Sequence, residues 1–288
     1  DTADAIEGAV TDDSAGVLDS ATTITAGDGV DLNLTVAEYK QIADGDTTLS
    51  SGYYISDTAD NIEAEISADG SSLGVLSGAQ SVTSTDEAIT LTMAGADALL
   101  GSTTVATDYE VVDDASAFLP TPNMATLMGA VSITVEDATV DQAMGLVALQ
   151  DMAGVDNLDF SIAGDESLSD LSVMQATAAV EATNVVAGDV SVKDSAGMIV
   201  SAGYGMPETT SIDLAAVQQV TVMTDPATNE DLTTYPELAG IADVIELNGA
   251  VTLTVDQAGL TLTGPGSYEV FDNATAIEGA VTDDSAGV

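Results

Sequence analysis

Paired aspartates in stretches that also contain Gly or Ser are the side chains of this sequence best suited to bind a ligand. Ca²⁺ takes about six to eight oxygen ligands from carboxylates and loop carbonyls. Three stretches offer such oxygens, so we predict Ca²⁺ binding there. They are TDDSAG with Asp12 and Asp13, AGDGVDL with Asp28 and Asp31, and VVDDAS with Asp113 and Asp114.

The same carboxylates also have a structural interpretation. AGDGVDL matches the Ca²⁺-binding nonapeptide GGxGxDxU only in part, because Ala26 replaces the first Gly and Asn33 the apolar eighth residue. Asp57 and Asp113 stand where helix N-caps belong, directly after short alternating runs. Metal binding and helix capping therefore both remain open, and most other carboxylates are expected to face water.

Catalysis is disfavoured by the residue types that the chain lacks. The sequence has no His and no Cys, which removes the commonest general base and the thiol nucleophile. A pair of carboxylates can hydrolyse glycosides, but with 49 acidic residues no single pair stands out, and Trp is absent as a sugar platform. We expect no enzymatic activity and no small-molecule substrate.

The charge of the chain excludes further classes of function. The formal net charge is −47, and Lys40 and Lys193 are its two basic residues. Phosphate contacts need Lys and Arg, so no nucleic-acid binding is expected. No apolar run is long enough to span a bilayer, which argues against membrane insertion. Self-repulsion must be screened by salt or bound cations, while 45% hydrophobic residues indicate a folded chain.

A long internal repeat joins the two ends of the sequence. AIEGAVTDDSAGV runs over 5–17 and again over 276–288, an offset of 276 − 5 = 271 residues. Thirteen identical residues indicate tandem duplication. We interpret residues 1–271 as one period of a tandem array and 272–288 as the start of the next.

Two shorter motifs recur inside this period. The first reads YYISDTADNIEA from Tyr53, YEVVDDASAF from Tyr109 and YEVFDNATAIEGA from Tyr268. The companion motif reads LNLTVAEY, ITLTMAGA, VSITVEDA and VTLTVDQA, with VSVKDSAG (190–197) as a degenerate fifth copy. We place sub-repeats near residues 1, 57, 113, 164 and 225, giving about ten half-units of about 27 residues per period.

Each half-unit is expected to form a strand followed by a helix. Tyr53 and Ile55 alternate as in a strand, Asp57 or Thr35 would cap the helix that follows, and Ala59, Ile62 and Ile66 share one helical face. Stacking such units predicts an α/β solenoid of β-helix-like coils with one continuous parallel sheet. Prolines 207, 226 and 236 predict a protruding loop between about 203 and 238.

The pattern YxIxDTAxNIxA, alternating with LTLTxxxA, resembles tandem repeats in very large secreted bacterial surface proteins. These are RTX-like, type I-secreted adhesins and S-layer proteins, and the matching residues are centred on Tyr53–Ala64 and Ile89–Thr92. The resemblance implies an extracellular, cell-surface location and no catalytic residue. The expected function is a self-associating filament, sheath or stalk. The alternatives are an adhesin stalk with its binding tip outside this segment, and an S-layer-type lattice.

Overall fold

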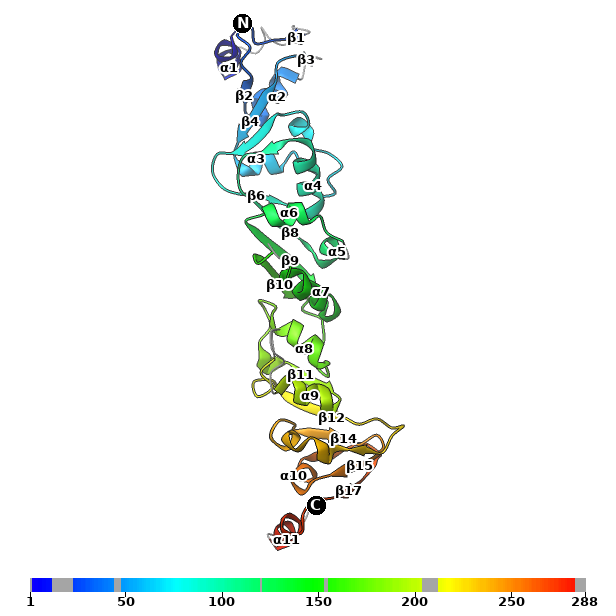
Figure 1. The fold of residues 1–288 in the computed structure, drawn as a ribbon. Coiled ribbons are helices and arrows are strands. Elements are labelled where there is room, and N and C mark those ends of the chain that lie inside the picture. Colours follow the sequence, from blue (N-terminus) through cyan, green and yellow to red (C-terminus); the bar gives the residue numbers. More distant parts are fainter. Residues whose placement is uncertain are drawn as a thin grey trace. The chain divides into compact units, whose positions relative to one another are not determined.

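The structure, a computed structural model, describes residues 2–11, 23–43, 48–119, 121–152, 155–203 and 212–282. The chain folds into two compact units. Unit 1 comprises Asp1–Glu136 and Ala148–Asp159, and unit 2 comprises Asp137–Val147 and Phe160–Val288. Strands and helices alternate along the chain in both units (Figure 1).

Short strands and helices of up to ten residues make up unit 1. Its elements are α1 (Ala3–Thr11), β1 (Thr23–Ile24), β2 (Leu32–Leu34), α2 (Val36–Ala43), β3 (Thr48–Leu49), β4 (Tyr53–Asp57), α3 (Ala59–Glu63), the 3-10 helix η2 (Gly74–Leu76), β5 (Ser81–Ser84), β6 (Ile89–Leu91), α4 (Met93–Ser102), β7 (Thr104–Val105), β8 (Tyr109–Asp114), α5 (Ala115–Phe118) and α6 (Met124–Gly129). The division between the units passes through β9 (Ser132–Ala138), α7 (Val140–Gln150) and β10 (Leu158–Ile162).

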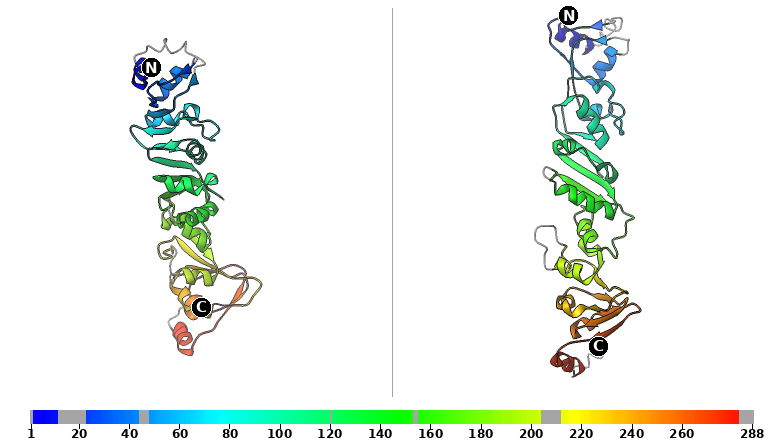
Figure 2. Two further views of the ribbon diagram at one scale, coloured as in Figure 1. Left: turned by 45° about the horizontal axis from the view of Figure 1, so that its top comes forward. Right: turned by 45° about the vertical axis from the view of Figure 1, so that its right-hand side comes forward.

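Unit 2 has the same kind of composition. Its elements are α8 (Val173–Val180), η3 (Ala187–Asp189), β11 (Ser191–Asp194), α9 (Ala196–Gly203), β12 (Gln219–Met223), β13 (Glu230–Asp231), η4 (Leu232–Thr234), η5 (Pro236–Gly240), β14 (Val244–Glu246), β15 (Ala250–Leu253), α10 (Val255–Ala258), β16 (Thr261–Thr263), β17 (Ser267–Val270) and α11 (Ala274–Thr282). Both views in Figure 2 show its orange strands running side by side.

The predicted single solenoid is wrong. The described residues form five short sheets, in the orders β1-β3, β2-β4-β5-β7, β6-β8-β9-β10, β11-β12-β14-β16 and β13-β15-β17. The strand pairs are parallel, as expected, but paired residues are separated by 267 − 250 = 17 positions in one pair and by 219 − 191 = 28 in another. Connections of such unequal length do not form identical coils, so the fold is an α/β arrangement without the expected continuous sheet or β-helix.

The local periodicities that predicted strands and helices are nevertheless present. Along β4 the residues alternate between buried and more exposed positions, starting with the buried Tyr53. In α4 the residues Met93, Ala96 and Leu99 are buried on one face, as their spacing predicts. The helix expected to reach Ile66 is shorter, because α3 ends at Glu63. Small aliphatic side chains form most of the core of each unit.

Part of the region expected to protrude as a loop forms regular elements. Residues 204–211 lie outside the described part of the chain. The remainder of the 203–238 stretch contains β12, β13, η4 and most of η5. Pro236 does not interrupt structure there, because it stands at the start of η5, where its missing N–H has no helical partner to lose.

Gly264 provides a test of the tight turn between β16 and β17. Its φ is +89°, and a Cβ would lie 2.4 Å from the carbonyl oxygen of Leu247. Gly264→Ala should destabilise unit 2 by about 1–3 kcal/mol, the usual cost of a strained non-glycine backbone. Gly240→Ala is the control, because a Cβ there meets no atom within 4 Å. Urea unfolding that gives equal stability for the two variants would contradict this account of the turn.

Candidate functional site

Four aspartates share one hydrogen-bonding geometry, and we call them the cap carboxylates. Each stands within two residues of the end of a strand, and its Oδ2 accepts the N–H of the first residue of a helix that precedes that strand. Its Oδ1 accepts the N–H of the residue that follows it in sequence. The four are Asp57, Asp113, Asp194 and Asp272.

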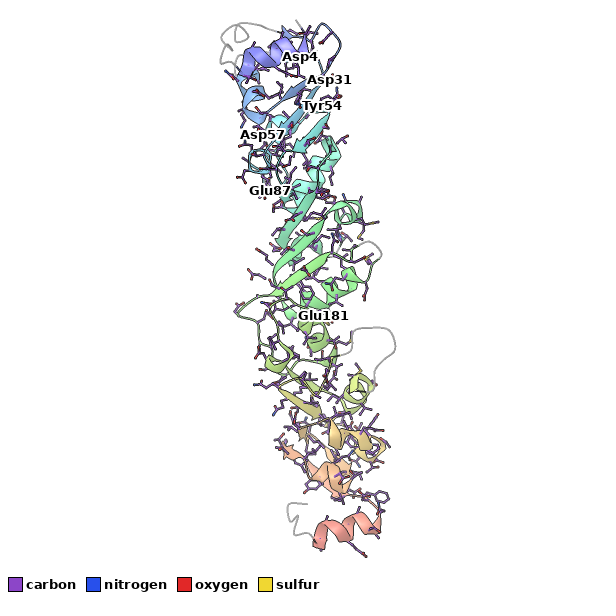
Figure 3. The ribbon with its side chains drawn as sticks, turned by 90° about the vertical axis from the view of Figure 1, so that its left-hand side faces the viewer. Asp4, Asp31, Tyr54, Asp57, Glu87 and Glu181 are labelled. Atoms are coloured by element: carbon purple, nitrogen blue, oxygen red, sulfur yellow. The ribbon has the colours of Figure 1, made fainter. Side chains whose placement is uncertain are left out.

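The distances are alike in all four places. Asp57, which is buried, accepts the Val36 N–H at 2.9 Å and the Thr58 N–H at 2.8 Å (Figure 3). It also accepts the side-chain N–H of Asn61 at 2.8 Å. In the other three, the helix N–H donors are Met93 at 3.0 Å, Val173 at 3.0 Å and Val255 at 3.1 Å.

Strand register explains why the carboxylate reaches the helix. Leu34 of β2 pairs with Ile55 of β4, so two residues further along Val36 N–H faces the side chain of Asp57. The same two-residue step links the other strand pairs to their carboxylates, as in Leu91 with Val111 ahead of Asp113. The carboxyl ends of neighbouring parallel strands lie at one edge of the sheet, where both chain segments turn into helices.

The companion motif supplies the second half of each cap. Thr92, Ser172 and Thr254 are helix N-caps whose hydroxyl oxygens accept an N–H three residues later. Thr35 does the same for α2, with Glu38 Oε2 accepting the Thr35 N–H at 2.8 Å. The expectation that Thr35 caps a helix is therefore confirmed, and Thr92 and Thr254 of the same motif cap theirs in the same way.

Capping by Asp57 and Asp113 differs from the prediction. The N-cap of α3 is Thr58, and that of α5 is Asp114. Asp57 and Asp113 instead accept N–H groups from α2 and α4, which lie some twenty residues earlier. The sequence pattern predicted that each carboxylate caps the helix that follows it. The helix that it actually caps precedes it in the sequence.

One copy of this arrangement was assigned to the wrong motif from sequence. Residues 190–197 were interpreted as a companion motif, but they carry the cap carboxylate Asp194. Its companion is LSVMQA, where Ser172 and Gln175 form a capping box. The S-x-x-Q spacing was the signal that identifies it.

Two further aspartates place negative charge at helix starts. Asp28 Oδ2 accepts the Ala3 N–H of α1 at 3.1 Å, and Asp86 Oδ1 accepts the Ala59 N–H of α3 at 2.9 Å. The hydrogen bond from Ala3, followed by that from Val30, holds the pKa of Asp28 below its usual value, and the Ala59 bond lowers the pKa of Asp86 in the same way. Carboxylates are favoured at these positions by the partial positive charge of the helix N-terminus.

The structure gives other hydrogen-bond partners to the described residues among those predicted to bind Ca²⁺. Asp12 and Asp13 lie outside the described residues. Asp31 Oδ2 accepts the Tyr54 hydroxyl at 3.2 Å (Figure 3). Asp114 accepts the Ser116 N–H at 2.9 Å, and the Ser116 hydroxyl lowers its pKa, while Asp28 and Asp113 accept the helix N–H groups described above. Within the described ranges, no three acidic side chains gather as a metal site, so Ca²⁺ binding stays a prediction.

A second candidate site is an apolar surface at the end of unit 2, which we call the C-terminal face. It is formed by β17, α11 and the residues between them (Figure 1). Tyr268 is 38% exposed, Phe271 71%, Ile277 39% and Val281 77%. The matching Tyr53 and Tyr109 of the same motif are buried. Single exposed apolar side chains are common on protein surfaces, so these four do not by themselves define an interaction site.

A hollow in unit 2 is lined almost entirely by side chains without ionisable groups. It holds about 450 Å³ and is lined by Ala202, Gly203, Ile212, Asp213, Leu214, Ala215, Gly240 and Ile241. Asp213 is the one ionisable side chain among these described lining residues, and its Oδ1 accepts the Ala215 N–H.

Comparison with protein-family models, with curated proteins and with solved structures finds no match to this chain. In the described part of the chain, no helix combines the length and apolar character that crossing a membrane requires.

Asp57→Ala tests the cap geometry. The change leaves the Val36 and Thr58 N–H groups and the Asn61 side chain without their acceptor, so unfolding free energy should fall by about 1–3 kcal/mol. Asp60→Ala is the matched control, because it removes the same charge from an exposed position of α3 and should cost less than about 0.5 kcal/mol. Denaturant unfolding would count against the cap geometry if the two variants were equally stable.

Asp28→Asn tests the pKa shift. The folded pKa of Asp28 lies below its ordinary value of 3.8, so its stabilising effect is present above that value and is lost as pH falls through the folded pKa. The native chain should therefore melt above the variant at about pH 6, and this difference should close below pH 3.8.

The comparison between native and variant chains cancels the general effect of acid on net charge. Glu87→Gln, at an exposed position of unit 1 (Figure 3), should show no such closing difference. A melting difference for Asp28→Asn that is constant with pH would contradict the assignment.

Proposed function

We propose that this chain is an extracellular structural protein that self-associates into a surface filament, sheath or stalk and is stabilised by cations. The observation that carries the proposal is the recurrence of one capped strand-and-helix arrangement in both units. Asp57 and Asp113 build it in unit 1, and Asp194 and Asp272 in unit 2. Repetition of a structural module, with no concentration of chemical groups at one copy, is typical of scaffolding proteins.

The extracellular location is carried by the resemblance of the YxIxDTAxNIxA and LTLT-type motifs to secreted surface repeats.

Cation dependence follows from the charge. Lys40 pairs with Glu65, and Lys193 pairs with Glu246 at 2.5 Å, which raises the pKa of Lys193. Both basic side chains are thus engaged within their own units, and a formal charge of −47 opposes any contact between chains. Salt at about 0.1 M shortens the range of this repulsion to about 10 Å.

Association should therefore increase with ionic strength. We expect sedimentation velocity to show mainly single chains at about 10 mM NaCl and larger species at about 150 mM or above, with elongated or sheet-like assemblies visible by electron microscopy. Single chains at every salt and protein concentration would contradict the proposal.

Matched-ionic-strength samples separate screening from specific Ca²⁺ binding. If Na⁺ and Ca²⁺ promote association equally, screening is sufficient. If only Ca²⁺ acts, and a chelator reverses it, the cation is bound specifically.

A further inference from the structure

Two short stretches of the sequence match the pattern Asn-x-Ser/Thr. They are NLT over residues 33–35 and NAT over residues 273–275. In exported proteins this pattern is the acceptor for an N-linked glycan, which projects from the protein surface. Because the pattern is short, the surroundings of each Asn decide whether a glycan fits there.

The first of these asparagines lies on the outward face of a sheet. Asn33 is the middle residue of β2 and is exposed, while Leu32 and Leu34 on either side of it are 0% and 1% exposed. Successive side chains of a strand point to opposite faces, so Asn33 points away from the core. Strands that pair with β2 lie in the plane of the sheet, so this outward direction does not depend on which strands flank it.

An aromatic ring stands beside Asn33 on the same face. The strand register pairs Asn33 with Tyr54 of β4, and neighbouring strands lie about 4.8 Å apart. The Tyr54 side chain is 37% exposed, and its hydroxyl donates to Asp31 Oδ2 at 3.2 Å (Figure 3). This hydrogen bond ties the Tyr54 side chain to the segment that leads into β2, close to Asn33.

Other copies of the two motifs have a different pair at this place. The register pairs Thr90 with Glu110, and Thr252 with Glu269. The Thr252 hydroxyl donates to Glu269 Oε1 at 3.1 Å. A hydroxyl and a carboxylate are thus replaced in β2 and β4 by an amide and an aromatic ring. The replacement removes a charge and supplies an apolar face, on which the CH groups of a sugar ring can pack.

The second asparagine is placed differently. Asn273 Nδ2 donates to Asp272 Oδ1 at 3.0 Å, and Asn273 Oδ1 accepts the N–H of Ala276 at 3.0 Å. Both ends of this amide are therefore used at the start of α11. The combination of an outward-facing amide with a neighbouring ring is found at Asn33.

We infer that Asn33 is an N-glycosylation site and that the first sugar of its glycan lies against the ring of Tyr54. The inference rests on the extracellular location in the proposed function, because this modification is made on exported chains. The donor is a glycosyl diphosphate carried on a lipid. Asn33 Nδ2 bonds to C1 of the first sugar and loses one proton, while the bond from C1 to the diphosphate oxygen breaks and the lipid diphosphate leaves.

The fold determines when this reaction takes place. Asn33 lies in a strand that is paired with β4. The Thr35 hydroxyl, the third residue of the acceptor pattern, donates to Glu38 Oε2 at 2.9 Å and accepts the Glu38 N–H at 3.2 Å. A transferase that must bind an extended acceptor and its hydroxyl therefore acts before β2 pairs and α2 is capped.

Mass spectrometry of the chain taken from the surface of the cells that produce it tests the attachment. The peptide that contains Asn33 should carry the mass of a glycan, and Asn33→Gln should remove it. Thr35→Ser is the matched control, because it keeps the hydroxyl that both the acceptor pattern and the α2 cap use. An unmodified Asn33, or a glycan on Asn273 alone, would overturn the inference.

Tyr54→Glu tests the packing of the sugar, since it introduces the residue that the other copies have at this place. The glycosylated native chain should melt about 2–4 °C above Asn33→Gln, because the sugar packs on the ring. In the Tyr54→Glu background, Asn33→Gln should leave the melting temperature unchanged. Tyr54→Phe keeps the ring and should keep the difference. Equal melting differences in the native and Tyr54→Glu chains would overturn the contact between sugar and ring.

The outcomes separate this inference from the proposed function. If the chain is found on the cell surface and associates, but Asn33 is unmodified, the glycosylation site is wrong while the proposed function stands. If Asn33 carries a glycan but the chains stay single at every salt concentration, the site is right and self-association fails. If the chain is neither exported nor modified, both fail.

Discussion

The hydrogen bond from the first N–H of a helix to a carboxylate of the strand that pairs with the one leading into that helix is the interaction on which the rest of this structure depends. It joins two consecutive strand-and-helix segments at the edge of a parallel sheet, as Asp57 does for α2 and β4. It also places a negative charge where the helix dipole favours one. The chain has a formal charge of −47, so most of its carboxylates repel one another. A carboxylate at a helix N-terminus is instead attracted by the helix dipole and stabilises the fold locally.

This local rule does not need a regular superhelix. Asp272 reaches Val255 over 17 residues, while Asp57 reaches Val36 over 21, and the donor–acceptor geometry is the same. The strand register determines which carboxylate meets which helix N–H group. The length of the connecting segment can therefore differ between copies without changing this hydrogen bond. Repetition of the motif therefore predicted the module correctly and the solenoid wrongly, because the described strands form five separate sheets.

Sequence was informative wherever the deciding contact lies within a few residues. Thr92 caps its own helix three residues away, and this was predictable from the motif. The partner of Asp113 was not, because Met93 lies 20 residues earlier and meets it only through strand pairing. The burial of Ile6 and exposure of Ile277 were also beyond prediction, since identical local sequence contains no information about which neighbour covers it.

The contrast between α1 and α11 leads to a statement about stability. A helix of nine residues is marginal in water by itself, because nucleation is costly and few hydrogen bonds follow it. α1 is supported by the burial of Ile6 and Val10 and by Asp28 at its first N–H. α11 has the same apolar residues, with Val281 77% exposed. The support of α1 by buried side chains and by a carboxylate at its first N–H shows how a helix this short is stabilised in unit 1.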